Sequence, residues 1–226
     1  MRFFLLILAA AIPAYIIGGI NGAIITSKHF FHKDIRKFGS GNPGLTNFFR
    51  VFGKPGLLLV IAIDIIKTIA PVIFGGWLFA RFSDTILSQV WLFDWIFPVS
   101  LFGQAIAGFF VVLGHCFPVF YHFKGGKGVM AVGAILLVLD WRLALISWGL
   151  FIVLTALTRY VSLAAIVGAV AFPVAQFYIG IGGYWELLAT SMCAILTIVR
   201  HKSNIGRLVK GEESKLSFRR GKDSGD

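Results

Sequence analysis

Long uncharged stretches of apolar residues alternate along this chain with shorter polar segments. Residues 3–27, 95–114 and 160–185 contain no Asp, Glu, Lys or Arg. A helix of about 20 residues matches the hydrocarbon core of a bilayer, which is about 30 Å thick. The chain has 58% hydrophobic and 14% charged residues, against roughly 25% charged residues in a soluble domain. It is therefore predicted to be an all-α, polytopic membrane protein.

The apolar pattern predicts seven transmembrane helices, at about residues 3–25, 56–80, 96–116, 127–140, 142–158, 160–180 and 185–200. The first uncharged stretch is longer than the apolar region of a signal peptide, so a retained span is predicted there. The stretches within 129–139, 143–158 and 187–199 are short, and they are expected to thin the bilayer or to enter it in part. A single membrane domain is expected over residues 1–217, with a disordered basic tail over 218–226.

The charge pattern predicts the orientation of these helices. The net charge is +11, and with seven spans 17 of the 21 Lys and Arg residues fall on one side. Because cytoplasmic loops gather positive charge, we expect the N-terminus outside and the C-terminus in the cytoplasm. Residues 81–98 then form an outer loop, with Trp91 and Trp95 at the interface. Cations placed between spans are not expected to bind nucleic acid. Cys116 and Cys193, in or beside spans, are expected to be packing residues.

Three polar segments fall on the predicted cytoplasmic side, at residues 38–54, 114–128 and 200–215. Together they combine glycines with Lys, Arg, His, amide and hydroxyl side chains, and their carboxylates are Glu212 and Glu213. Such a site suits an anionic substrate. It lacks the oxygen ligands that a hard metal ion needs, so no metal and no cofactor is predicted. Gly39, Gly41 and Gly44 form a G-x-G-x-x-G, but no strand precedes it, so a dinucleotide site is not expected.

Asp64 and Lys67 place two charges within an otherwise apolar predicted span. Residues three apart share one face of a helix, and charge inside a membrane is costly unless it is paired or functional. Two interpretations stay open. The residues are either a structural ion pair that joins helices, or a pair in which Asp64 keeps Lys67 charged for contact with a substrate.

The three polar segments resemble the cytoplasmic motifs of the bacterial acyl-phosphate glycerol-3-phosphate acyltransferases. The match reads GSGNPG-x-TN-x-x-R-x-x-GK at 39–54, GH-x-FP-x-F-x-x-FKGGKGV at 114–129 and H-x-x-NI-x-RL-x-x-G-x-E-x-K at 201–215. The resemblance covers essentially the whole chain. It implies a seven-span enzyme of the bacterial cytoplasmic (inner) membrane that acts among membrane lipids in phospholipid biosynthesis. The implied reaction joins acyl phosphate and glycerol 3-phosphate to give 1-acyl-glycerol 3-phosphate and phosphate. Departures from the usual pattern leave the acyl-chain preference open; they are Leu45, Thr68, Met130 and Ala131.

Phosphate is a good leaving group, so the glycerol 1-hydroxyl is expected to attack the acyl carbonyl directly, without an acyl-enzyme. Ser40 and Asn42 are predicted to hydrogen-bond the carbonyl or the attacking hydroxyl. Lys127 is predicted to contact phosphate at the start of a helix, beside a glycine turn with free N–H groups. His201 is predicted to orient glycerol phosphate or to act as general base. The predicted substrate-binding residues are Gly41, Thr46, Asn47, Arg50, Lys54, Lys67, His115, Lys124, Gly125, Gly126, Asn204 and Arg207.

Other functions are compatible with parts of this pattern. The main alternative is a membrane transporter of an anionic solute, because such proteins contain intramembrane charges and glycine-interrupted helices. A lipid-binding scaffold without catalysis is a third interpretation. His29 and Asp34 form H-x-x-x-x-D, a pair used by a different class of glycerolipid acyltransferase. No matching basic motif follows it, so we interpret both as interfacial loop residues. The sequence predicts no particular oligomeric state.

Overall fold

The computed structural model of the protein describes residues 2–83 and 98–216. Within these ranges the regular structure is helical and contains no β-strand, which confirms the all-α prediction. Trp91, Trp95 and the predicted tail over 218–226 lie outside the described residues.

The described residues form ten α-helices and two short 3₁₀ helices. In chain order they are α1 (Arg2–Gly18), α2 (Gly22–Phe31), η1 (Ile35–Lys37), α3 (Leu45–Phe52), α4 (Leu57–Phe82), α5 (Val99–Cys116), η3 (Val119–Tyr121), α6 (Val129–Leu139), α7 (Trp141–Thr158), α8 (Val161–Ile179), α9 (Tyr184–Arg200) and α10 (Lys202–Val209). Each predicted span contains a helix, because α1 and α2 cover the first and α4 to α9 cover the others.

Among the described residues, five helical segments are long and apolar enough to cross a membrane. They are Arg2–Phe31, Leu57–Phe82, Val99–Tyr121, Trp141–Thr158 and Val161–Ile179. α6 is shorter, with 11 residues, and α9, with 17 residues, is not among these five. The lengths support a multi-pass membrane protein, whereas the number of seven spans stays a prediction.

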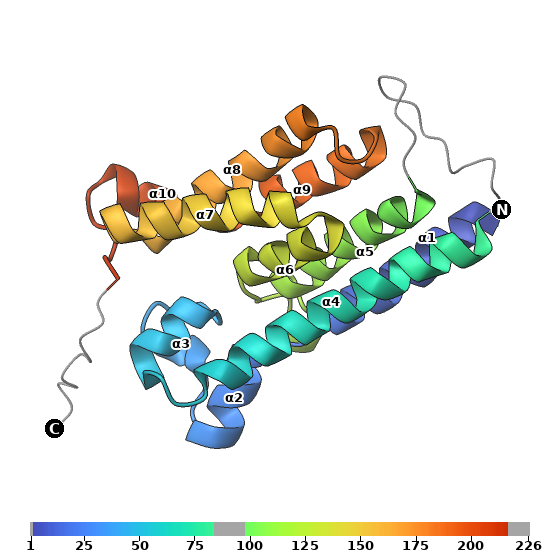
Figure 1. Cartoon of the computed structure of the whole chain (residues 1–226). Helices are drawn as coiled ribbons and strands as arrows, with labels where there is room; N and C mark the ends of the chain where they lie inside the picture. The colour runs from blue at the N-terminus through green and yellow to red at the C-terminus, as the bar shows by residue number, and fades with distance from the viewer. Residues whose placement is uncertain (1, 84–97, 217–226) are drawn as a thin grey trace, which may run out of the picture.

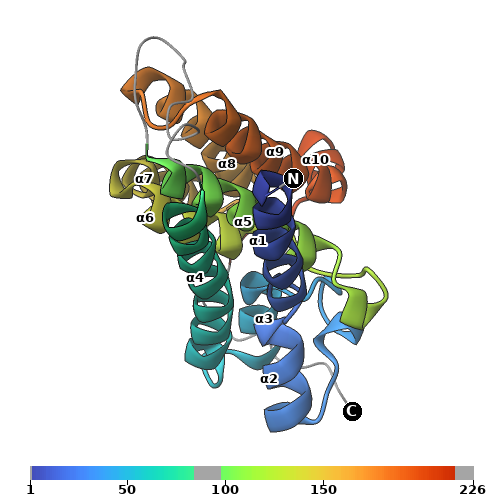
Figure 2. The ribbon, with the colours of Figure 1, turned by 90° about the vertical axis from the view of Figure 1, so that its right-hand side faces the viewer.

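The helices form two groups that meet along α5 and α6 (Figure 1). α1 and α4 lie side by side in one group, and α7, α8 and α9 make up the other. Figure 2 shows α5 between the α1–α4 pair and the α8–α9 pair. In Figure 1, α2, α3 and α10 all lie at the end of the bundle that is opposite to the start of α1. The first and third polar segments therefore reach the same end of the molecule.

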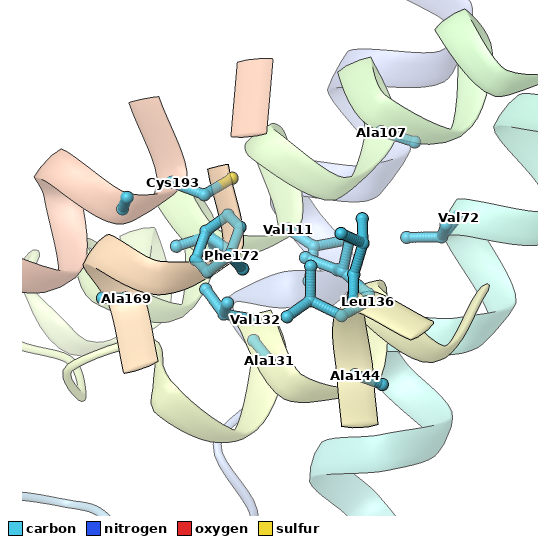
Figure 3. Close-up of a cluster of buried hydrophobic side chains, with 14 of the residues drawn as sticks. Val72, Ala107, Val111, Ala131, Val132, Leu136, Ala144, Ala169, Phe172 and Cys193 are labelled. Atoms are coloured by element: carbon cyan, nitrogen blue, oxygen red, sulfur yellow. The ribbon is translucent and has the colours of Figure 1, made fainter. Parts of the chain in front are cut away.

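Small residues and a shared apolar core hold the two groups together. A Cβ on Gly75 would come within 2.6 Å of the carbonyl O of Gly103, so α4 and α5 approach more closely than larger residues allow. Figure 3 shows Val111 of α5, Phe172 of α8 and Cys193 of α9 converging in the buried cluster between the groups. Cys193 is 3% exposed and unpaired, which confirms its prediction as a packing residue.

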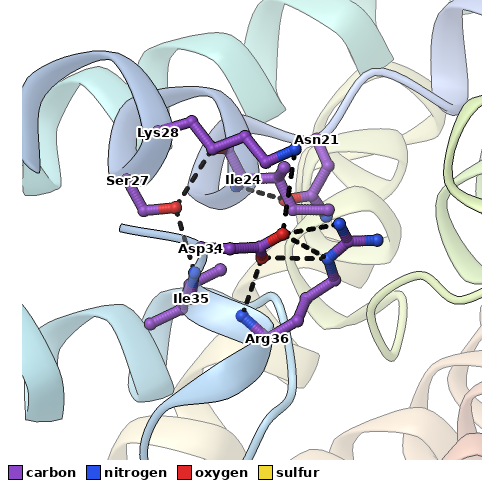
Figure 4. A network of polar contacts seen from close by, with 7 residues as sticks. All are labelled: Asn21, Ile24, Ser27, Lys28, Asp34, Ile35 and Arg36. Atoms are coloured by element: carbon purple, nitrogen blue, oxygen red, sulfur yellow. Dashed lines mark hydrogen bonds and ion pairs between the residues drawn. The ribbon is translucent and has the colours of Figure 1, made fainter. Parts of the chain in front are cut away.

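Polar contacts around Asp34 fix the chain between α2 and the glycine turn at residues 39–44 (Figure 4). Asp34 accepts a hydrogen bond from the backbone N–H of Arg36 at 3.0 Å and pairs with the guanidinium of Arg36 at 2.6 Å. The hydrogen bond from the Arg36 side chain lowers the pKa of Asp34 to about 2. Asn21 caps α2 and donates from Nδ2 to the carbonyl O of Pro43 at 3.0 Å. Asp34 is therefore a structural residue of this loop, and the glycine turn is anchored to the start of α2.

Candidate active site

A cavity of about 590 Å³ lies where the three polar segments meet. Its wall includes all four residues predicted to be catalytic, which are Ser40, Asn42, Lys127 and His201. Six of the predicted binding residues also line it: Thr46, Asn47, Arg50, His115, Asn204 and Arg207. The structure thus gathers segments that are far apart in the sequence around one space.

Asn47 builds the glycine turn of the first segment. Its Oδ1 accepts a hydrogen bond from the backbone N–H of Ser40 at 2.9 Å, and its Nδ2 donates to the carbonyl O of Phe38 at 3.0 Å. Gly39 in this turn has a φ of +57°, where a side chain would be strained. A Cβ there would also lie 2.3 Å from Asn47 Oδ1. Asn47 is therefore committed to the backbone, and its contribution to the site is to present Ser40.

The glycine turn of the second segment differs from the prediction. The N–H of Gly126 donates to the carbonyl O of His115 at 3.0 Å, and the N–H of Gly125 donates to that of Cys116 at 3.3 Å. Arg200 donates to the carbonyls of Gly126 and Gly125, at 3.1 and 2.9 Å. The N–H groups of Gly125 and Gly126 are therefore not free for an anion, contrary to expectation, since these two glycines close the end of α5. A Cβ on Gly126 would lie 2.2 Å from His115 Nε2.

Lys127 follows this turn and precedes α6. Its Nζ donates a hydrogen bond to Asn204 Oδ1. Burial lowers the pKa of Lys127 to about 8, although the nearby Glu213 carboxylate acts in the opposite direction. An ammonium carries three N–H donors. A lysine held by one amide oxygen in the wall of the cavity is therefore suited to contact an anionic substrate.

The backbone of α9 holds His201 in one tautomer. Its Nδ1 lies 2.8 Å from the carbonyl O of Thr197, and because a carbonyl accepts, Nδ1 carries the hydrogen. Burial lowers the pKa of His201 to about 4, so the ring is neutral near pH 7. Nε2 is then a hydrogen-bond acceptor in a side chain that lines the cavity.

Glu213 completes the third segment, although sequence reasoning missed it. Its carboxylate accepts hydrogen bonds from Asn204 Nδ2 at 2.6 Å, Ser162 Oγ at 2.7 Å and Arg207 Nε at 2.7 Å. Burial alone would raise the pKa of Glu213, but these hydrogen bonds outweigh burial and hold the pKa below its usual value. The sequence did contain a sign of this role, because Glu213, unlike Glu212, is a specified position of the third motif.

A second hollow of about 450 Å³ adjoins the cavity. Four residues line both spaces: Ser40, Asn42, Lys127 and Arg207. Its wall also holds the predicted residues Gly41, Lys124 and Gly125, and the missed arginines Arg36 and Arg200. Among the described residues that line it there is no carboxylate, so its lining is rich in cations, although Arg36 and Arg207 also pair with Asp34 and Glu213. Arg200 could have been predicted to belong to the site, because it directly precedes the third motif.

Asp64 and Lys67 form the ion pair that their spacing predicts. Lys67 Nζ lies 2.8 Å from Asp64 Oδ1, and their side chains are 2% and 3% exposed. Lys67 also donates to the carbonyl O of Ile20 and contacts His115 Nδ1 at 2.9 Å. These contacts use all three ammonium donors, and Lys67 lines neither hollow. Asp64 itself lines the cavity. The structure favours the structural interpretation, and the predicted contact of Lys67 with substrate has no support from the geometry.

Two further predictions concern Lys54 and metal ions. Lys54 is exposed in the turn between α3 and α4 and lines neither the cavity nor the second hollow. Its substrate-binding role therefore has no support from the geometry. Across residues 2–83 and 98–216, no three His, Cys, Asp or Glu side chains lie close enough together to hold a metal ion.

An apolar slot of about 40 Å³ continues from the cavity between α6, α7, α8 and α9. Val129, Phe151 and Ala165 line both the slot and the cavity. The other lining residues of the slot are Val132, Gly133, Ser147, Trp148, Gly168, Ala169 and Thr197. A polar space that adjoins an apolar one suits a ligand with a charged head and a hydrocarbon tail.

Comparison with known proteins gives consistent matches along the chain. Residues 8–211 match the family model described as glycerol-3-phosphate acyltransferase. Proteins named glycerol-3-phosphate acyltransferase from Staphylococcus aureus strains Newman and JH9 are 36% identical over 216 residues, which is 95% of this chain and 100% of theirs. Two crystal structures of PlsY, described as an integral membrane glycerol 3-phosphate acyltransferase, are also similar. The glycerol 3-phosphate form has a TM-score of 0.78 at 30% identity and covers 93% of this chain and 96% of the other. The lysophosphatidic acid form has a TM-score of 0.77 at 29% identity and covers 94% and 96%.

Proposed function

This chain belongs to the glycerol-3-phosphate acyltransferase family, and from this premise we propose how the site works. The protein is a multi-pass membrane enzyme that transfers an acyl group to glycerol 3-phosphate in phospholipid synthesis. The transporter alternative is not favoured. The relatives carry an enzyme's name, and the polar side chains surround a cavity built from three segments rather than a path between related repeats.

The acyl donor in this proposal is acyl phosphate. The motif resemblance supports it, and so do the cations around the cavity and the adjoining positive hollow. Acyl phosphate and glycerol 3-phosphate each carry about two negative charges near neutral pH, since the second pKa of a phosphate is about 6. Lys127 and Arg207 lie in the wall common to both spaces, where they offset the repulsion between two phosphates.

The proposed orientation has seven spans, with the N-terminus outside and the cavity open to the cytoplasm of a bacterial inner membrane. The start of α1 lies at the end of the bundle opposite to α2, α3 and α10 (Figure 1). The segments at that second end hold most of the Lys and Arg residues. Both observations support this orientation through the positive-inside rule.

The proposed reaction is one direct displacement. The oxygen of the glycerol 1-hydroxyl forms a bond to the acyl carbonyl carbon, and the bond from that carbon to the phosphate oxygen breaks. The hydroxyl proton ends on the released phosphate, so the products are the ester and hydrogen phosphate. Ser40 and Asn42 hydrogen-bond the reacting groups, and Lys127 neutralises the charge that gathers on the departing phosphate.

The proton passes to phosphate rather than to His201. A group with a pKa of about 4, as His201 has, is a weaker base than a phosphate with a pKa near 6. His201 instead offers the Nε2 lone pair to the 1-hydroxyl and orients it for attack. Asn204 positions Lys127 and does not contact the reacting groups itself. Its Oδ1 accepts a hydrogen bond from Lys127, and its Nδ2 donates one to Glu213.

The cavity of about 590 Å³, in which all four predicted catalytic residues meet, is the observation that carries this proposal. The test uses purified protein, labelled glycerol 3-phosphate and three donors in turn: acyl phosphate, acyl-CoA and an acyl carrier protein thioester. We expect product with acyl phosphate, with one phosphate released for each product formed. Turnover with acyl-CoA and none with acyl phosphate would overturn the assignment of the donor.

A further inference from the structure

The hydroxyl of Thr197 is buried without a hydrogen-bond partner. The residue is 1% exposed, and Oγ1 has no partner among the described residues. Burying a hydroxyl without a hydrogen bond costs free energy, and most buried polar atoms in proteins are paired. Valine would fill nearly the same volume without this cost. Thr26 and Thr155 also have buried hydroxyls without a partner, so it is the position of Thr197 that points to a ligand.

Thr197 lies where the apolar slot meets the polar cavity. Its side chain lines the slot, and a Cβ on Gly128, a residue of the cavity wall, would lie 3.2 Å from Thr197 Oγ1. Gly128 is the neighbour of Lys127 along the chain. The carbonyl of Thr197 accepts the hydrogen bond from His201 Nδ1 at 2.8 Å. The unpaired hydroxyl of Thr197 therefore lies between the cavity wall near Lys127 and the apolar slot.

An acyl phosphate has the same order of groups: a phosphate, a carbonyl and a hydrocarbon chain. With the phosphate against Lys127 and the start of the chain at the slot, the carbonyl falls at the junction where Thr197 lies. We propose that the Thr197 hydroxyl donates a hydrogen bond to the carbonyl oxygen of the acyl donor. This assignment rests on the proposed function and adds a residue that the sequence motifs do not include.

The hydrogen bond would act on the reacting carbonyl itself. The carbonyl oxygen gains negative charge while the glycerol oxygen adds to the carbon, and it loses that charge when the bond to phosphate breaks. A donor already in place stabilises this charge without reorganisation. Thr197 would therefore raise turnover at the expense of stability, as polar groups in functional sites often do.

The test compares Thr197→Val, which removes the hydroxyl at nearly constant volume, with Thr197→Ser, which keeps it. Thr155→Val is the matched control, because Thr155 Oγ1 is also buried without a partner but lines neither the cavity, the second hollow nor the slot. We expect Thr197→Val to lose about a hundredfold in turnover with acyl phosphate. Its KM for glycerol 3-phosphate should be preserved, and its thermal stability should equal or exceed that of the wild type. Thr197→Ser should stay within a few-fold of the wild type, and Thr155→Val should be fully active.

A spectroscopic measurement separates contact with the carbonyl from a structural role. Isotope-edited infrared spectra of a bound, carbonyl-labelled acyl phosphonate should show a lower carbonyl frequency in the wild type and Thr197→Ser than in Thr197→Val. Equal frequencies, or wild-type turnover in Thr197→Val, would overturn the Thr197 assignment and leave the proposed function standing. A wild-type enzyme that does not use acyl phosphate would overturn both together.

Discussion

Lys127 is the residue at which the proposed chemistry is most directly tested. Replacing it by Gln keeps length and polarity but removes the charge. We expect folded, inserted Lys127→Gln to lose roughly a hundred- to thousandfold in turnover, which is the usual effect of losing one contact to developing charge. The control is Lys210→Gln, since Lys210 is exposed at the end of α10 and should be dispensable. Near-normal turnover in Lys127→Gln would move the phosphate site toward Arg50 and Arg207.

The same lysine should limit activity at alkaline pH. A lysine is charged below its pKa, and the pKa of Lys127 is lowered to about 8 by burial. The rate of the wild type should therefore fall as the pH rises through about 8. Lys127→Arg keeps its charge at every accessible pH, so its rate, whatever its size, should lack this decline. A decline of the same midpoint in Lys127→Arg would assign the titration to another group.

At the residue scale, sequence motifs predicted which side chains meet but not what each one does there. Ser40, Lys127 and His201 line the cavity as expected. In contrast, the side-chain amide of Asn47 hydrogen-bonds the backbone of the glycine turn. The ammonium group of Lys67 contacts three protein groups, which occupy its three donors. Two of the partners of Lys67, Ile20 and His115, belong to segments that are far away in the sequence, and no local pattern records them. For Glu213, the donors Asn204 and Arg207 lie in the same motif, and only the contact with Ser162 of α8 was hidden by distance along the sequence.

At the scale of elements, the Asp64–Lys67 pair connects α4 to the break between α1 and α2. Asp64→Ala should destabilise the protein strongly, because it leaves a buried ammonium without its counter-charge; such losses are typically about 3–5 kcal/mol. The double variant Asp64→Ala with Lys67→Met should be less destabilised than Asp64→Ala alone. Thermal unfolding in detergent measures both effects, and additive losses around the double-mutant cycle would contradict the pairing.

The helices were more predictable than the site because their signal is local. Every predicted span contains a helix, and the expected short stretch at 129–139 is observed as α6. α6 is about 16 Å long at 1.5 Å per residue, and its residues 131–136 are buried by its neighbours. Such a helix does not need to cross a bilayer alone. Hydropathy cannot predict this, because it depends on which helices surround α6.

For the whole molecule, the orientation in the membrane is the main untested prediction. Reporters fused after Gly53 and after Lys215 should both report the cytoplasm, and a reporter at Ser88 should report the outside. The reason is the position of 17 of the 21 Lys and Arg residues on one side when seven spans are drawn. Opposite locations for the first two reporters would contradict the seven-span arrangement.

The place of Glu213 in the cavity also has a consequence for the order of biosynthesis. Glu213 is held by Ser162, Asn204 and Arg207, and the N–H of Leu216 donates to the carbonyl O of Arg159 at 2.7 Å just beyond it. During synthesis the glycine turn at 39–44 is made early, and the residues from Glu213 to Leu216 that make these contacts are made after all of the helices. All the long helices are therefore synthesised before Glu213, and we expect a chain stalled short of residue 213 to lack the carboxylate that holds Asn204 and Arg207.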